Sequence, residues 1–164
     1  MRSLGTILAA LCLLQALAGC EPEQKVDENS AEFESWLQDQ GLMPLGAAAA
    51  TVLLRDRTLY GRYAGGEGGW IEYYSNSGVS VFQPMAEQNP KRRLVYFGTW
   101  WSEADRTCFS YPQRHLDCYR VYYDGKTIYF VRMEDSGDSP AGSLVVAAEE
   151  VKTGNTEKYP FVDN

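Results

Sequence analysis

The chain has 164 residues, with 22 acidic and 15 basic side chains and a net charge of −7 at neutral pH. This length corresponds to one ordinary domain that can bury a core of its own. The acidic balance argues against nucleic acid as a partner, because nucleic-acid binders neutralise phosphates with clustered lysine and arginine.

The N-terminus has the order of an export signal. Arg2 supplies a positive start, an apolar stretch follows over residues 4–17, and the small residues Ala18 and Gly19 come before Cys20. The apolar stretch is shorter than the ~20 residues that a membrane-spanning helix needs. We therefore predict a cleaved signal peptide over residues 1–19.

The segment Leu17-Ala18-Gly19-Cys20 resembles the lipobox of bacterial lipoproteins, whose cysteine is acylated and becomes the new N-terminus. The resemblance implies a palmitate-bearing lipid anchor at Cys20. Several acyl chains hold a protein at the membrane permanently, since each buried methylene contributes about 0.8 kcal/mol. Glu21 stands where an aspartate would favour the inner membrane, so the resemblance points to the outer membrane, with the domain facing the periplasm. An ordinary secretory signal remains the alternative, because Ala16-Leu17-Ala18 also fits a cleavage site.

Two short helices are predicted after the signal. Asn29 followed by Glu32 is typical of a capping box, and Gly41 is a natural helix end. Between them, apolar residues recur at helical spacing: Phe33, Trp36 and Leu37. The alanine-rich stretch 45–54 predicts the second helix.

From residue 58 onward, aromatic and β-branched residues dominate, and turn residues interrupt them at regular intervals. The clearest hairpin signals are Asn76-Ser77-Gly78 and Asp124-Gly125. Eight strands are predicted, over 58–64, 70–74, 79–82, 93–101, 107–111, 117–123, 126–133 and 143–151. Such strands, with no helices between them, predict a mainly β fold: a small antiparallel meander or an eight-stranded barrel with a helical N-terminal cap.

The expected organisation has four parts. The signal peptide over residues 1–19 precedes a polar, flexible tether over 20–28. A helical segment over 29–55 follows, and an antiparallel β domain occupies 56–164.

The cysteines predict one disulfide. Of the four cysteines, Cys12 leaves with the signal and Cys20 carries the lipid, so Cys108 and Cys118 remain in the folded part. Two cysteines in an oxidising envelope usually pair. The alternative is a redox or metal site, but the chain has no Cys-x-x-Cys motif and a single histidine, His115. We therefore expect no metal and no cofactor.

From residue 41 onward, the chain resembles an uncharacterised family of exported proteobacterial proteins. The residues that carry the resemblance are Leu53-Leu54, Leu59-Tyr60-Gly61, Trp70-Ile71-Glu72-Tyr73-Tyr74, Gly78, Gly98-Thr99-Trp100, Cys108, Tyr111, Cys118 and Gly125. The resemblance implies a small lipocalin-like β-barrel and no established activity.

No arrangement of residues predicts catalysis. Ser110, His115 and Asp117 lie close together, but their spacing is more typical of a polar loop than of a catalytic triad. Glu72 and Glu103 show no spacing that indicates a glycosidase pair. We therefore expect that the protein is not an enzyme.

The aromatic residues of the strands supply the candidate binding site. Adjacent residues of a strand point to opposite faces, so one of Trp100 and Trp101 belongs to the core and the other is available to a ligand. The expected function is that of a lipid-anchored envelope protein that binds a small apolar ligand or an envelope protein, with inhibition of that protein as one form. The alternative is a structural accessory lipoprotein of an outer-membrane complex.

Overall fold

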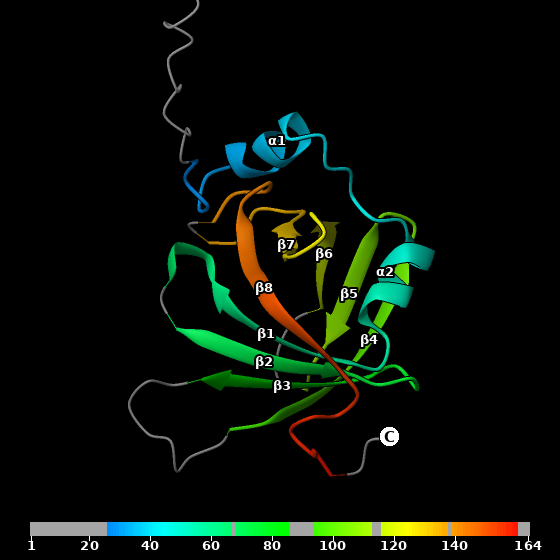
Figure 1. Cartoon of the computed structure of the whole chain (residues 1–164). Coiled ribbons are helices and arrows are strands. Elements are labelled where there is room, and N and C mark those ends of the chain that lie inside the picture. Colours follow the sequence, from blue (N-terminus) through cyan, green and yellow to red (C-terminus); the bar gives the residue numbers. More distant parts are fainter. Residues whose placement is uncertain (1–25, 67, 86–93, 113–115, 138, 161–164) are drawn as a thin grey trace, which may run out of the picture.

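The fold is a closed eight-stranded antiparallel barrel with two short helices (Figure 1). The computed structural model describes residues 26–66, 68–85, 94–112, 116–137 and 139–160. The predicted signal peptide, Cys20, most of the expected tether and His115 lie outside the described residues. No helix within the described part of the chain has the length and apolar character needed to cross a bilayer.

Each strand pairs with the next along the chain, and the last pairs with the first, so the predicted barrel topology is confirmed. The strands are β1 (Arg57–Tyr63), β2 (Gly69–Tyr74), β3 (Val79–Met85), β4 (Tyr96–Glu103), β5 (Arg106–Ser110), β6 (Asp117–Tyr123), β7 (Ile128–Arg132) and β8 (Leu144–Thr153). β7 begins two residues later than predicted. The amides of Lys126 and Thr127 donate to the Asp124 carboxylate and so belong to the turn.

The barrel closes where β1 meets β8. The register of this pair slips between Tyr60 and Gly61, which marks a β-bulge. A side chain at Gly61 would clash with the carbonyl group of Ala147 across the seam. Glycine at this position therefore lets the two backbones approach closely enough to complete the sheet.

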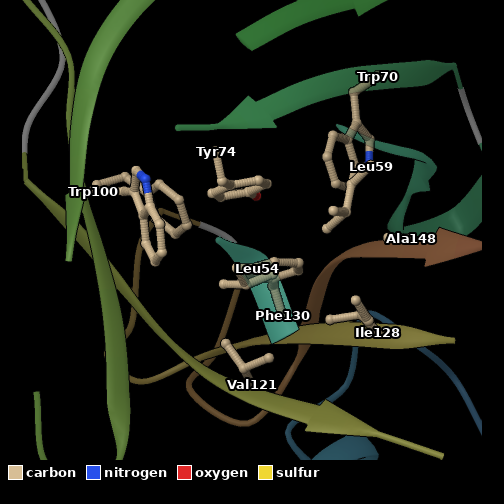
Figure 2. Packing of buried hydrophobic residues seen from close by; sticks show 10 residues of the cluster. Leu54, Leu59, Trp70, Tyr74, Trp100, Val121, Ile128, Phe130 and Ala148 are labelled. Carbon is tan, nitrogen blue, oxygen red and sulfur yellow. The ribbon is translucent and has the colours of Figure 1, made fainter. Parts of the chain in front are cut away.

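The core lies inside the barrel, where alternate residues of each strand point inward. Figure 2 shows that its side chains come from several strands, with Leu54 of the second helix in their midst. Aromatic rings meet edge to face: Tyr74 lies 5.4 Å from Trp100, and Trp70 lies 6.3 Å from Phe130. Such pairs add about 1 kcal/mol each to the contribution of burial.

Helix α2 (Ala47–Leu54) closes one end of the barrel, where the β2–β3, β4–β5 and β6–β7 turns lie. Its last residue, Leu54, is fully buried among the barrel side chains (Figure 2). The helix begins at Ala47 rather than at residue 45, because the Leu45 amide donates to the Val121 carbonyl on β6. The Ala47 amide donates to Ala104 in the β4–β5 turn, which fixes the helix across the barrel end.

Helix α1 (Glu32–Asp39) packs on the outer face of β6, β7 and β8. Its buried residues Phe33 and Leu37 contact a second apolar cluster of Tyr122, Val131, Leu144 and Ala147. The carboxylate of Glu34 accepts hydrogen bonds from Arg120 and from the Tyr122 hydroxyl. The helix is therefore joined to the barrel by both apolar and charged contacts.

The predicted end of α1 is confirmed, and its predicted capping box is wrong. Gly41 has φ +80°, and the amides of Gly41 and Leu42 donate to the last turn of the helix, as in a Schellman motif. At the other end, Ala31 is the N-cap residue and makes no side-chain cap. The Asn29 amide donates to Asp27 instead. Asn29 therefore belongs to a turn that precedes the helix.

The expected tether ends on the barrel itself. The Glu28 carboxylate accepts two hydrogen bonds from the Arg62 guanidinium, and the Leu144 amide donates to the Glu28 carbonyl. The described part of that segment is thus attached to β1 and β8.

The predicted disulfide is present between Cys108 and Cys118. The two cysteines are directly opposite each other in the β5–β6 pair, and Thr107 and Phe109 on either side point inward. The bond therefore lies on the outer face of the barrel and staples one hairpin.

Replacing both cysteines with alanine should lower the free energy of unfolding by about 3 kcal/mol, because the closed loop restricts the unfolded chain. Denaturant titration of this variant and of wild-type protein measures the loss. Wild-type protein treated with reductant is the control and should lose a similar amount. Equal stability of all three samples, or two free thiols in non-reduced protein by intact mass, would contradict the pairing.

Candidate functional site

A pocket of about 100 Å³ lies inside the barrel at the end opposite to α2. This is the end at which β1, β5 and β7 finish and at which β6 and β8 begin. The lining is mostly aromatic and includes two acids: Tyr63, Glu72, Tyr74, Phe82, Phe109, Tyr111, Asp117, Tyr119, Phe130, Val145 and Val146. The volume is below the ~300 Å³ of a pocket for a drug-sized ligand, so the space suits a group of a few heavy atoms.

Glu72 is the more deeply buried of the two acids in this lining. Along β2 it lies between Trp70 and Tyr74, whose rings both belong to the barrel core, so alternation points its carboxylate inward as well. The residue is only 7% exposed. An acid buried in this way is rare unless its oxygens have partners.

Both oxygens of Glu72 accept a hydrogen bond from a tyrosine. The Tyr74 hydroxyl donates to Oε2 at 3.0 Å, and the Tyr111 hydroxyl donates to Oε1. The hydroxyl of Ser80, which is fully buried, donates to the Tyr111 oxygen at 3.1 Å. A chain of hydrogen bonds therefore runs from β3 through Tyr111 to the carboxylate on β2.

Burial raises the pKa of Glu72 to about 7, although the hydrogen bonds from Tyr111 and Tyr74 act in the opposite direction. Burial, followed by the nearby negative charge of Glu72, also raises the pKa of Tyr74 and of Tyr111. Both tyrosines thus remain protonated donors at neutral pH, while Glu72 changes its charge near pH 7.

The ring of Tyr111 reaches the pocket because β4 has a glycine where the ring crosses it. A Cβ at Gly98 would lie 2.5 Å from the Tyr111 ring and 2.6 Å from the Ser110 carbonyl. The ring then packs against Phe82, 6.1 Å away between centroids. Gly98 is therefore a positioning residue for one of the two donors to Glu72.

The other aromatic residues form a continuous wall beside the carboxylate. Phe109 lies 5.9 Å from Tyr74, 5.8 Å from Tyr119 and 6.0 Å from Phe130. These rings come from four different strands, so closure of the barrel is what brings them together.

The structure separates the two predicted binding residues. Trp100 is 5% exposed, packs inside the barrel and donates its indole N–H to the Ser75 carbonyl. Trp101 is 38% exposed on the outer face. Neither tryptophan lines the inner pocket.

Trp101 lines a wider depression of about 460 Å³ on the outside of β4, β5 and β6. Its other lining residues include the disulfide, Leu116 and several charged side chains. Leu116 is 57% exposed, so the depression presents two large apolar groups to solvent.

The two glutamates that were considered for catalysis are not brought together, whereas Ser110 follows Phe109, the residue that pairs with Asp117. Glu103 lies at the end of β4 and forms an exposed ion pair with Arg106, whereas Glu72 is inside the barrel. Ser110 ends β5, Asp117 begins β6, and His115 lies outside the described residues. Among the residues that the structure describes, no group of three or more His, Cys, Asp or Glu side chains is placed to hold a metal ion.

Sequence reasoning missed the site around Glu72. A signal was present, because alternation in Trp70-Ile71-Glu72-Tyr73-Tyr74 places the acid on the same face as two large aromatic residues. The contribution of Tyr111 has no comparable signal, since it reaches Glu72 from beyond the end of β5.

Fold and site together define a small closed antiparallel barrel with an internal pocket that contains an ionisable group. Comparison of the chain with family models, curated proteins and solved structures yields no match. The lipoprotein and family resemblances therefore rest on the sequence motifs that carry them.

Replacing Trp100 with alanine should lower the free energy of unfolding by about 3–5 kcal/mol, because it leaves a cavity among packed rings. The same change at Trp101 should cost less than about 1 kcal/mol. Thermal or denaturant unfolding of the two variants checks this difference. Equal losses would contradict the assignment of one tryptophan to the core and the other to the surface.

Replacing Glu72 with glutamine should remove a pH-dependent loss of stability. The pKa of Glu72 rises from 4.5 to about 7 on folding, so the stability linked to this group is fully present below about pH 4.5 and is lost as the pH rises through about 7. The loss reaches about 3 kcal/mol above pH 8. Glutamine cannot ionise, so Glu72→Gln should be more stable than wild type at pH 8. This advantage in the free energy of unfolding should be about 2 kcal/mol larger at pH 8 than at pH 5.

Denaturant titrations of both proteins across this pH range provide the measurement. Glu103→Gln is the matched control, because it makes the same substitution at an exposed acid outside the barrel interior. A constant difference between Glu72→Gln and wild type at all pH values would show that Glu72 does not titrate inside the barrel.

Proposed function

We propose that the protein is a lipid-anchored binding module of the bacterial envelope and that its barrel holds a small ligand at the end opposite to α2. The observation that carries this proposal is the internal pocket, in which a buried carboxylate faces a wall of aromatic rings. An apolar pocket with a few convergent polar groups and a perturbed pKa is the usual form of a binding site. The ligand is small, since the pocket measures about 100 Å³.

The cost of burying Glu72 supports a role in binding. A pKa raised from 4.5 to about 7 means that the ionised state is disfavoured by about 3 kcal/mol in the folded protein. A hydrophobic residue of similar size would avoid that cost. Groups that reduce stability in this way are concentrated at functional sites.

The position of the attached N-terminal segment supports anchoring close to the membrane. Glu28 is bound to the barrel through Arg62, so only residues 20–27 separate a lipid on Cys20 from the domain. Eight extended residues span at most about 28 Å. The domain would therefore lie within about 28 Å of the bilayer surface, which we expect to be the periplasmic face of the outer membrane.

Native mass spectrometry of the protein extracted from envelopes tests the binding function. Wild-type protein should retain a co-purifying small molecule. Val146→Phe, which fills the pocket from β8, should lose it, whereas Val151→Phe, an exposed position of the same strand, should keep it. Binding inside the barrel would be contradicted if both variants kept the small molecule, or if wild-type protein carried none.

Labelling with radioactive palmitate tests the anchor. Wild-type protein should incorporate the label and remain with the membrane fraction. Cys20→Ala should remain unprocessed and unlabelled, because the thiol is the acylation site in the lipobox resemblance. Cys12→Ala is the control and should be labelled normally; label in Cys20→Ala would contradict lipidation at this residue.

A second candidate function is supported by the outer depression around Trp101. An exposed tryptophan that lines a surface depression is typical of the residues that dominate protein–protein binding energy. On this basis the protein would hold an envelope protein partner, as an accessory of an outer-membrane complex or as an inhibitor. Crosslinking in intact cells should then capture a partner with wild type and Trp100→Phe but not with Trp101→Ala.

A further inference from the structure

We infer that the ligand of the inner pocket is a small organic cation, an alkylammonium group held between the Glu72 carboxylate and the aromatic rings around it. This inference rests on the proposed binding function and specifies its ligand. It follows from the charge of the lining, the arrangement of the rings, the hydrogen bonding of Glu72 and the size of the pocket.

The charge of the described lining has one sign. Glu72 on β2 and Asp117 at the start of β6 are both acids, and none of the described lining residues is basic. An anionic ligand would meet two carboxylates without a compensating cation, which disfavours it strongly at low dielectric. A cation would gain from both acids.

The aromatic wall provides the second element of ammonium recognition. Seven of the eleven described lining residues are phenylalanine or tyrosine. The face of an aromatic ring attracts a cation within about 6 Å of its centroid, and aromatic cages bind alkylammonium groups in this way. The rings of Phe109, Tyr119 and Phe130 lie within 6.4 Å of one another, so one ligand would contact several of them.

The hydrogen bonds from the two tyrosines hold the Glu72 carboxylate in place, and the carboxylate can accept further hydrogen bonds. An ionised carboxylate has about four acceptor positions. Tyr74 and Tyr111 occupy one position on each oxygen, and Ser80 holds Tyr111 in turn. The remaining positions are available to an N–H donor of a ligand without breaking this arrangement.

The size of the pocket limits the alkyl part. A cavity of about 150 Å³ accommodates benzene, and this pocket measures about 100 Å³. An ammonium group with about three or four carbons fits that space, whereas a lipid chain does not.

Binding of a cation should be coupled to release of a proton from Glu72. The titratable groups around it are Tyr63 on β1, Tyr74 on β2, Tyr111 after β5, and Asp117 and Tyr119 on β6. Burial keeps Tyr74 and Tyr111 protonated over the neutral range, so Glu72 is the group expected to change charge. At about pH 6 the carboxyl proton would pass to solvent as the ammonium ion enters, and the charge of the pocket would be preserved.

Isothermal titration calorimetry of the mature full-length chain in non-ionic detergent tests the inference. The probes are propylammonium and tetramethylammonium, with propanol as the neutral analogue and propionate as the anionic one. Both cations should bind, and their affinity should rise about tenfold from pH 6 to pH 8 as Glu72 ionises. Titrations in buffers of different ionisation enthalpy should show nearly one proton released per cation at pH 6.

Glu72→Gln should weaken cation binding at pH 8 by more than about tenfold and abolish proton release. The variant is expected to fold, because glutamine resembles the protonated acid. The matched control is Glu103→Gln, which changes an exposed acid on the outer face and should leave both quantities unchanged.

Three results would overturn the inference. The first is equal affinity for propanol and propylammonium, and the second is unchanged cation affinity in Glu72→Gln. Either result would mean that the barrel binds a small ligand without selecting a cation, so the proposed binding function would still stand. No binding of either cation would also overturn it, and the mass spectrum of the extracted protein and its pocket-filling variant would then decide the proposed function separately.

Discussion

Closure of the sheet between β1 and β8 is the constraint on which the rest of this structure depends. An open meander would leave the inward face of β2 in water. The carboxylate of Glu72 would then be solvated, and burial would not raise its pKa. Closure at Gly61 removes the last two sheet edges and encloses the aromatic rings. The same step withdraws the carboxylate from solvent, so the fold itself creates the electrostatic property of the site.

The two ends of the barrel are filled differently, and this difference positions the pocket. At one end, α2 inserts Leu54 among the core side chains. At the other end, the rings of Phe109, Tyr119 and Phe130 stop short of filling the interior, and Glu72 and Tyr111 occupy the boundary. The carboxylate of Glu72 and its hydrogen-bond partner Tyr111 therefore lie at the end of the barrel away from α2.

The eight strands were predictable because turn chemistry and strand alternation are local. Asp124-Gly125 forms its turn through the Asp124 side chain wherever the hairpin lies in the fold. Glu72 was not predictable with the same ease, because five consecutive residues of β2 are buried and no polar face distinguishes inside from outside. Tyr73 is covered on the outer face by Tyr159 from the C-terminal segment, a contact that depends on the assembled barrel. The approach of Tyr111 past Gly98 is likewise tertiary and leaves no pattern in the sequence.

Occupancy and stability should be linked through the same carboxylate. As the pH rises through about 7, an empty barrel must hold an ionised Glu72 away from water, and it loses stability accordingly. A cation beside the carboxylate would offset that loss, because it binds the folded chain in the state that ionisation otherwise disfavours. The rise in melting temperature caused by a saturating alkylammonium probe should therefore be larger at pH 8 than at pH 6. In Glu72→Gln the rise should be small and independent of pH, since the buried charge that the cation neutralises is no longer there.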